Sequence, residues 1–358
     1  MPRPIRATFD TAALRNNLAV ARARAPDSRA WAVVKANAYG HGLLRAVEAL
    51  AAADGFALLD LEEAVRLRDA GVRKPILLLE GFFSLDDLAL VVEHGLSVVI
   101  HSEEQVDILV AAGFPTRIPL YLKLNTGMNR LGFSPEAFAI ALERLQGCRM
   151  AGEITLMTHF ADADGERGVR EQLERFTKAT RDLALPRSLA NSAALLRFPD
   201  THADWVRPGI MLYGVSPFAD SVGDTHGLKP VMSLHSRLMA VNYFKRGDRV
   251  GYGGAWECPE DMPVGVVAIG YGDGYPRHAK TGTPVLVNNK RVPLIGRVSM
   301  DMICVDLRGQ PRARGGDPVC LWGTALPVEE IARYAGTIPY ELLCRVTSRV
   351  HIQSGEVS

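Results

Sequence analysis

The chain has 358 residues, of which 47% are hydrophobic, 41 are Lys or Arg and 40 are Asp or Glu. This length suggests two domains with a large buried core, and the formal net charge of +1 gives no global attraction to nucleic acid or to an anionic membrane. No apolar run reaches the roughly 18 residues that span a bilayer, and the N-terminus has no apolar signal segment. The five cysteines form no CxxC motif. We therefore expect reduced thiols, a cytoplasmic location and no metal site.

The first part of the chain alternates between short apolar runs and amphipathic segments. The segment Arg3–Phe9 is extended in character, and we expect the N-terminal residues 1–9 to pair with a later domain. Strand–helix alternation favours a parallel sheet built from right-handed crossovers. Eight units over about 210 residues favour a (β/α)8 TIM-type barrel at residues 10–226 over an open doubly wound sheet. The predicted strands are Trp31–Lys35, Gly55–Leu59, Pro75–Glu80, Leu96–Ile100, Ile118–Leu124, Ile154–His159, Ser188–Asn191 and Asp204–Arg207, and helical patterns cover 42–53, 61–70, 103–112, 135–146 and 168–183.

The character of the chain changes near Gly227. From there to about residue 325, Gly, Pro and Val become frequent and long helical patterns disappear. We expect residues 227–358 to form a second, mostly β domain. Its predicted strands include Val264–Ile269, Pro284–Val287, Met302–Asp306 and Pro318–Trp322.

Reactive side chains stand at the ends of five predicted barrel strands. Barrel enzymes place their catalytic groups at the C-terminal ends of the strands. Each of these residues alone has an ordinary explanation, such as a solvated lysine or a core histidine. Because the barrel brings them to one rim, their joint presence favours a functional site. The residues are Lys35, Lys123, His159, Asn191 with Ser192, and Arg207.

Lys35 ends an apolar strand and is followed by a glycine-rich turn containing Gly40 and Gly42. A lysine that forms a Schiff base must be partly desolvated, so that its free amine can attack a carbonyl. Tyr39 in the same turn could reach an anionic ligand. The segment alone is equally consistent with an ordinary strand-to-helix turn.

The segment 34–42, Val-Lys-Ala-Asn-Ala-Tyr-Gly-His-Gly, resembles the cofactor-lysine signature of the alanine racemase family. Further blocks match the family in the same order over nearly the whole chain. Two departures are Ser299, where many members have Cys, and the tail 347–352, which differs from the commoner Arg-Val-Pro-Arg ending. The matching blocks are 122–132, 158–160, 191–192, 206–210, 250–253, 270–275, 296–301 and 338–341.

The resemblance implies a pyridoxal-phosphate (PLP) enzyme of fold type III that interconverts L-alanine and D-alanine. Lys35 would carry PLP and act as the base on the D-face, and Tyr252 would be the base on the L-face. A free phenol is a poor base at neutral pH, and the resemblance assigns its activation to His159 and Arg207. Arg207 would face the pyridine nitrogen, where a permanently charged donor leaves that nitrogen unprotonated.

The resemblance also assigns the ligand contacts. Arg130 and Met300 would bind the substrate carboxylate, and in many members the lysine that matches Lys123 is carbamylated and orients that arginine. Two unmodified cations in a small pocket would be costly, which favours the modified form. Tyr271 and Tyr340 would narrow the entrance, and Asp301 would lie at the substrate. The cofactor-binding residues would be Lys35, Tyr39, Asn191, Ser192, Arg207, Gly209, Ile210 and Tyr340, of which Asn191 and Gly209 are also consistent with ordinary turns.

In the family Tyr252 and Met300 reach the cofactor of the partner subunit, so the resemblance implies a homodimer with shared sites. Three alternatives remain. A PLP-binding homeostasis protein would lack the β domain, and a barrel decarboxylase would have a carboxylate in place of Arg207. A broad-specificity or serine racemase is the nearest alternative, and such enzymes are commonly exported. Supply of D-alanine for peptidoglycan and alanine catabolism are equally compatible with the sequence.

Overall fold

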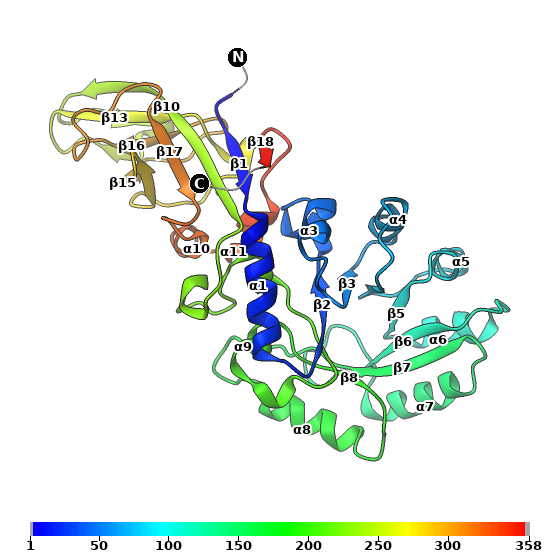
Figure 1. Cartoon of the computed structure of the whole chain (residues 1–358). Helices are drawn as coiled ribbons and strands as arrows, with labels where there is room; N and C mark the ends of the chain where they lie inside the picture. The colour runs from blue at the N-terminus through cyan, green and yellow to red at the C-terminus, as the bar shows by residue number, and fades with distance from the viewer. Residues whose placement is uncertain (1–2, 355–358) are drawn as a thin grey trace.

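The computed structural model describes residues 3–354 in two parts, a barrel and a β-rich domain beside it (Figure 1). Residues 1–2 and 355–358 belong to the predicted domains but lie outside the described residues. The domain limits 10–226 and 227–358 stay a prediction.

Eight parallel strands close into a barrel in sequence order. Closure is made between the last strand and the first, where Arg29 lies opposite Trp205 and Ala30 opposite Val206. The predicted fold class, a (β/α)8 barrel followed by a mostly β domain, is confirmed. The strands are β2 (Arg29–Val33), β3 (Gly55–Leu58), β4 (Ile76–Leu78), β5 (Ser97–Ile100), β6 (Ile118–Lys123), β7 (Ala151–Met157), β8 (Arg187–Ser188) and β9 (Trp205–Val206).

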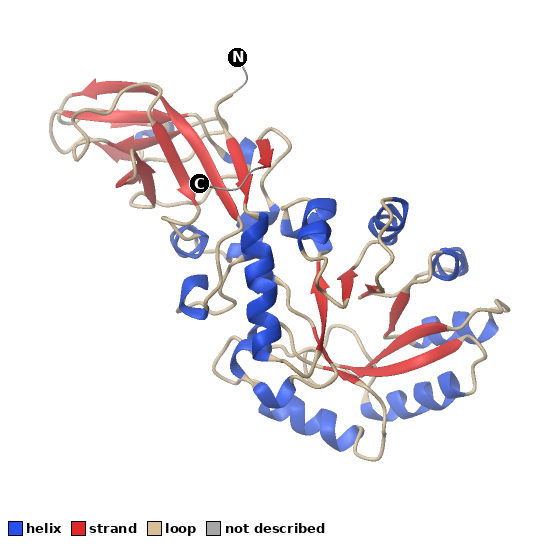
Figure 2. Ribbon diagram, in the orientation of Figure 1, coloured by secondary structure: helices blue, strands red, loops and turns tan. Residues whose placement is uncertain are grey.

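The helices surround the barrel (Figure 2). Several begin at an Asp or Ser whose side chain accepts a first-turn N–H, as Asp60 and Ser84 do. The helices are α1 (Thr11–Arg24), α3 (Leu43–Ala49), α4 (Leu61–Asp69), α5 (Leu85–Glu93), α6 (Glu103–Ala111), α7 (Pro135–Gln146), α8 (Arg170–Ala179) and α9 (Ser192–Arg197).

Trp31 fills the barrel interior. Its ring stacks on Trp205 with centroids 4.4 Å apart, and its Nε1 donates to the Tyr121 hydroxyl at 3.0 Å. Gly55 makes room for this ring, since a Cβ at that position would lie 2.2 Å from it. The barrel is therefore a packed core, and any cavity has to lie at its rim.

Seven of the eight predicted barrel strands extend beyond the C-terminal ends of the observed strands, among them those predicted to end at Lys35, Asn191 and Arg207. In these three, pairing stops at Val33, Ser188 and Val206. The reason is that the backbone turns at the rim, where Asn191 becomes the cap of α9 by accepting Ala194 N–H at 3.0 Å.

The second domain contains one sheet of eight strands. The N-terminal strand β1 pairs antiparallel with β10 and parallel with β18, so both ends of the chain join this sheet. Two helices, α10 (Val328–Ala335) and α11 (Pro339–Cys344), were not expected from the sequence. The sheet strands are β1 (Arg6–Phe9), β10 (Met232–Phe244), β13 (Met262–Val267), β14 (Pro284–Val287), β15 (Lys290–Ile295), β16 (Ile303–Asp306), β17 (Pro318–Trp322) and β18 (His351–Ser354), and a separate ribbon contains β11 (Arg249–Val250) and β12 (Trp256–Glu257).

Between β2 and α3 the backbone takes a left-handed turn, α2 (Lys35–Tyr39). Ala36, Asn37, Ala38 and Tyr39 have φ values of 53°, 52°, 55° and 51°. A left-handed conformation costs about 1–2 kcal/mol for each residue that has a Cβ. Consecutive residues in this state require compensation from their surroundings.

His41 supplies part of that compensation. Its Nδ1 lies 3.0 Å from Ala38 O and 2.9 Å from Tyr39 O, and because both partners are carbonyl oxygens, Nδ1 must carry a proton and donate. The ring is buried between Phe9 and Tyr213. Burial lowers the pKa of His41 from 6.5 to about 4, so the ring is neutral at physiological pH.

Substitution of His41 tests this support. An Asn amide can occupy the position of Nδ1, whereas a Gln amide extends toward the position of Nε2. We expect His41→Asn to be more stable than His41→Gln by about 1–2 kcal/mol, because only Asn keeps a donor for the turn carbonyls. Urea unfolding measures the difference, and equal stabilities would contradict the role of Nδ1.

The pH dependence gives a second test of the same histidine. The unfolded chain binds a proton at His41 near pH 6.5 and the folded chain only near pH 4, so stability should fall as the pH drops through this window. Unfolding curves of His41→Asn at several pH values should show a weaker dependence between pH 6.5 and 4 than the wild type.

Candidate active site

A cavity of about 440 Å³ lies at the C-terminal rim of the barrel. All five groups predicted from the strand ends line it. The lining residues with polar or charged side chains are Lys35, Tyr39, Glu80, Lys123, Arg130, His159, Asp164, Asn191, Ser192, Arg207 and Tyr340.

Lys35 enters this cavity from the start of the left-handed turn. Burial lowers the pKa of its amine, the nearby Arg130 lowers it further, and Glu80 acts in the opposite direction. A lowered pKa increases the fraction of free amine at neutral pH. Lys35 therefore has the property that a carbonyl-attacking lysine requires.

Arg207 is 4% exposed and is held by four protein groups. It donates to Ser188 Oγ at 2.7 Å, Thr158 O at 2.8 Å and Leu189 O at 3.0 Å. Within residues 3–354 it forms no ion pair with a carboxylate. Burial lowers its pKa to about 10, so it stays charged at neutral pH as an uncompensated cation beside the cavity.

His159 lies next to this cation. Arg207 Nη2 is 3.4 Å from His159 Nδ1, and since a guanidinium can only donate, Nδ1 is the acceptor and the proton of the neutral ring is on Nε2. Burial and the charge of Arg207 hold the pKa of His159 well below 6.5. A chain of polarised donors thus runs from Arg207 through His159.

Lys123 is 6% exposed at the end of β6. Burial, together with the charges of Arg207 and Arg130, lowers its pKa to about 8. A substantial fraction of this amine is therefore neutral near pH 8, which makes it nucleophilic.

Tyr39, Ser192 and Gly209, which we term the anion cradle, also line the cavity. Ser192 Oγ accepts from Gly209 N at 2.8 Å, and a Cβ at Gly209 would lie 2.7 Å from the Tyr39 hydroxyl. The Tyr39 ring packs 4.7 Å from Tyr213 and 6.1 Å from Tyr340. Burial raises the pKa of Tyr39 and of Tyr340, so both phenols keep their protons and can donate.

Four predicted residues lie outside the cavity of their own chain. Tyr252, Met300 and Tyr271 belong to the β domain, with exposed fractions of 69%, 51% and 40%. Asp301 is engaged by Arg3 and Arg349. One chain therefore brings together the Lys35 side of the predicted site but not the Tyr252 side.

Two acidic lining residues were missed in the sequence. Glu80 ends the predicted strand Pro75–Glu80, so the position of a carboxylate at a strand end was an available signal. Asp164 lies in a loop with no such signal. Among residues 3–354, no three His, Cys, Asp or Glu side chains are grouped so as to hold a metal ion.

Comparison with known proteins agrees with this geometry. Residues 9–217 match the family model "Alanine racemase, N-terminal domain", and residues 231–354 match "Alanine racemase, C-terminal domain". Alanine racemase of Nitrosospira multiformis is 54% identical over 98% of this chain and 99% of its own, and that of Nitrosomonas europaea is 55% identical over 99% of both.

Solved structures show the same relationship. Biosynthetic alanine racemase from Pseudomonas aeruginosa superposes with a TM-score of 0.96 at 48% identity and covers 99% of both chains. Alanine racemase from Bacillus anthracis with bound L-Ala-P gives a TM-score of 0.85 at 31% identity and covers 99% of this chain and 95% of the other. No helix within residues 3–354 is long and apolar enough to cross a membrane. The chain belongs to the alanine racemase family.

Proposed function

We propose that the chain is a PLP enzyme that interconverts L-alanine and D-alanine. The observation that carries this proposal is the cavity that combines a lysine of lowered pKa, a buried unpaired arginine and an anion cradle. Relatives more than 50% identical over nearly their full length are named alanine racemase, which supports the substrate. The β domain and Arg207 argue against the homeostasis-protein and decarboxylase alternatives.

The cavity fits PLP at three points. Lys35 offers the amine for the aldehyde, and the cradle of Tyr39, Ser192 and Gly209, together with Ile210 and Tyr340, would hold the phosphate. Arg207 would offer a donor to the pyridine nitrogen and would keep that nitrogen unprotonated. When bound, PLP supplies the electron sink that acidifies the Cα–H of an amino acid. Asn191 uses its side-chain oxygen to cap α9, so we expect its amide nitrogen to face the ligand.

Racemisation removes a proton from one face of Cα and returns one to the other face, which requires two bases. Lys35 serves the D-face. Tyr252 serves the L-face, and because it is exposed and absent from its own cavity, it acts in the cavity of a partner subunit. The donor chain through His159 and Arg207 would stabilise its phenolate there. The functional unit is therefore a homodimer with two shared sites.

The substrate carboxylate is bound by Arg130, with Met300 contributed by the partner. Lys123 is carbamylated, because its lowered pKa leaves free amine to capture carbon dioxide and the product is an anion among cations. All five cysteines are free thiols, which supports a location in the reducing cytoplasm.

Reduction of the holoenzyme tests the cofactor assignment. The purified protein should be yellow, and borohydride should fix the cofactor to Lys35. Peptide mapping by mass spectrometry identifies the labelled lysine. A label on Lys123, the other lysine that lines the cavity, would refute the assignment.

Carbamylation of Lys123 should increase with pH. The neutral amine is the reactive form, and its fraction rises as the pH passes through about 8. Carbon-13 NMR with labelled bicarbonate should therefore show a carbamate signal that grows from pH 7 to 9 and is absent from Lys123→Met. We also expect Lys123→Glu to have a lower KM for alanine than Lys123→Met, since it retains a carboxylate. Equal KM values would contradict a role for that charge.

Mixing of two inactive variants tests the shared site. Lys35→Ala lacks the cofactor lysine but keeps Tyr252, and Tyr252→Phe lacks the second base but keeps Lys35. If each site combines Lys35 of one chain with Tyr252 of the other, a mixed dimer contains one doubly defective site and one intact site. Random exchange makes about half of the dimers mixed and should restore about a quarter of the sites. Racemase activity before and after exchange measures the recovery.

A matched control is the mixture of Lys35→Ala with Arg207→Met. Both defects lie in the barrel, so every site of a mixed dimer keeps one of them and no activity should return. Demonstrated subunit exchange of the first pair without recovery would show that Tyr252 acts in its own chain.

A further inference from the structure

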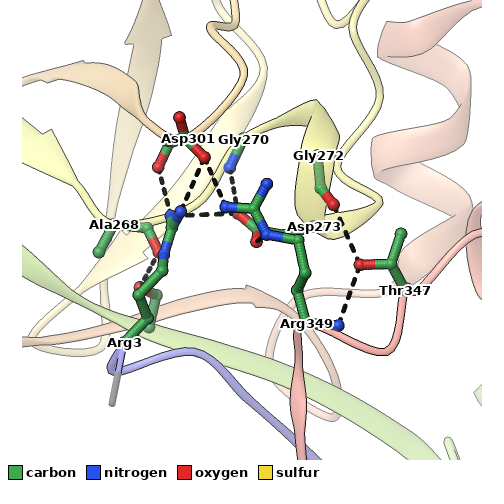
Figure 3. Close-up of polar contacts among 9 residues, drawn as sticks. Arg3, Ala268, Gly270, Gly272, Asp273, Asp301, Thr347 and Arg349 are labelled. Carbon is green, nitrogen blue, oxygen red and sulfur yellow. Dashed lines mark hydrogen bonds and ion pairs between the residues drawn. The ribbon is translucent and has the colours of Figure 1, made fainter. Parts of the chain in front are cut away.

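Two arginines from opposite ends of the chain meet on two loops of the β domain (Figure 3). Arg3 donates to Asp301 Oδ1 at 2.8 Å and lies 3.2 Å from Asp273 Oδ2. Arg349 lies 3.2 Å from Asp273 Oδ1 and also binds Asp301 Oδ1. Each arginine therefore bridges the same two carboxylates.

The two carboxylates sit on what we term the paired loops, residues 270–274 and 299–302. Backbone bonds join them, from Tyr271 N to Ser299 O at 3.0 Å and from Gly272 N to Met300 O at 2.9 Å. A Cβ at Gly270 would lie 2.3 Å from two carbonyl oxygens of the second loop, so the contact leaves no space for a side chain. The two paired loops are therefore packed directly against each other and fixed by backbone hydrogen bonds.

Thr347 attaches the C-terminal tail to the first of these loops. Its Oγ1 donates to Gly272 O at 3.0 Å and its N–H to Asp273 O at 3.2 Å. The tail segment 347–352, which departs from the common family pattern, therefore supplies both Thr347 and Arg349 to the paired loops.

Charge balance explains why two arginines are used. The Asp273 side chain is fully buried, and an ionised carboxylate without partners would be costly there. Arg349 and Arg3 lower the pKa of Asp301 by hydrogen bonding, so the carboxylate of Asp301 is ionised. A planar guanidinium can bridge two carboxylates at once, whereas a lysine ammonium offers one compact charge.

We propose that Arg3 and Arg349 are positioning residues that hold Tyr271 and Met300 at the substrate entrance of the partner's cavity. This inference rests on the proposed function, in which those two exposed side chains act in the neighbouring subunit. The carboxylate of Asp301 is engaged by the arginines and serves the same positioning role. The two ends of the chain thus set the discrimination between alanine and larger amino acids.

Steady-state kinetics of the full-length holoenzyme test the proposal. In Arg349→Met the paired loops lose one of their two bridges, so we expect the KM for alanine to rise about tenfold. The ratio of kcat/KM for serine to that for alanine should also rise, because a looser entrance discriminates less. The absorption spectrum of PLP at Lys35 should not change, and Arg349→Lys should recover part of both effects.

The matched control is Arg308→Met. Arg308 bridges two carboxylates in the same domain, Asp306 and Glu260, but contacts neither paired loop. The substitution Arg308→Met should lower thermal stability without changing the KM for alanine or the serine-to-alanine ratio of kcat/KM. If Arg349→Met does not fold, Arg3→Met and Asp301→Asn provide the same measurement with a milder change.

Racemisation of alanine by the wild type, measured first, establishes the proposed function independently of these variants. Given that activity, we compare Arg349→Met and Arg3→Met with the control Arg308→Met. If the KM for alanine and the serine-to-alanine ratio of kcat/KM are the same in all three variants, the positioning role is overturned and a purely structural role remains.

Discussion

Accumulated positive charge is the constraint on which the site depends. Lys35, Lys123, Arg130 and Arg207 all line one cavity, and the carboxylates among its lining residues are Glu80 and Asp164. Like charges at short range in a medium of low dielectric repel strongly. The same repulsion, added to burial, lowers the pKa of Lys35, Lys123 and His159. The lining of the cavity is thus suited to binding anions. Under the proposed function these anions are a phosphate, a carbamate and a substrate carboxylate.

The barrel keeps these cations together despite their repulsion. The closed pairing of its eight strands fixes where each strand ends. The stacking of Trp31 on Trp205 fills the barrel interior, so the charged side chains cannot move into it. The left-handed turn then directs Lys35 into the cavity. Strain in this turn is tolerable because His41 and the neighbouring aromatic rings are held by a rigid core.

The rim residues could be predicted from the sequence because the apolar runs mark the strands, and the C-terminal ends of all strands of a barrel lie on one rim whatever the structure of the loops. The left-handed turn could not be predicted, since the alanines Ala36 and Ala38 disfavour positive φ and tertiary contacts impose it. Helix α10 was missed because it has only eight residues and directly follows the Gly-, Pro- and Val-rich stretch that ends near residue 325. Asp301 illustrates a different limit: a motif marks a residue as important, but its bonds to Arg3 and Arg349 depend on segments almost 300 and 50 positions away in the chain.

The exposure of Tyr252 connects the charge of the cavity to assembly. Within its own chain, Tyr252 does not line the cavity that contains His159 and Arg207. In the proposed dimer the same phenol enters a cavity in which Arg207 has no carboxylate partner, and the developing phenolate would supply negative charge there. The barrel then gains a base and the tyrosine gains its activating cations in one step. Association would therefore generate chemistry that neither surface has alone.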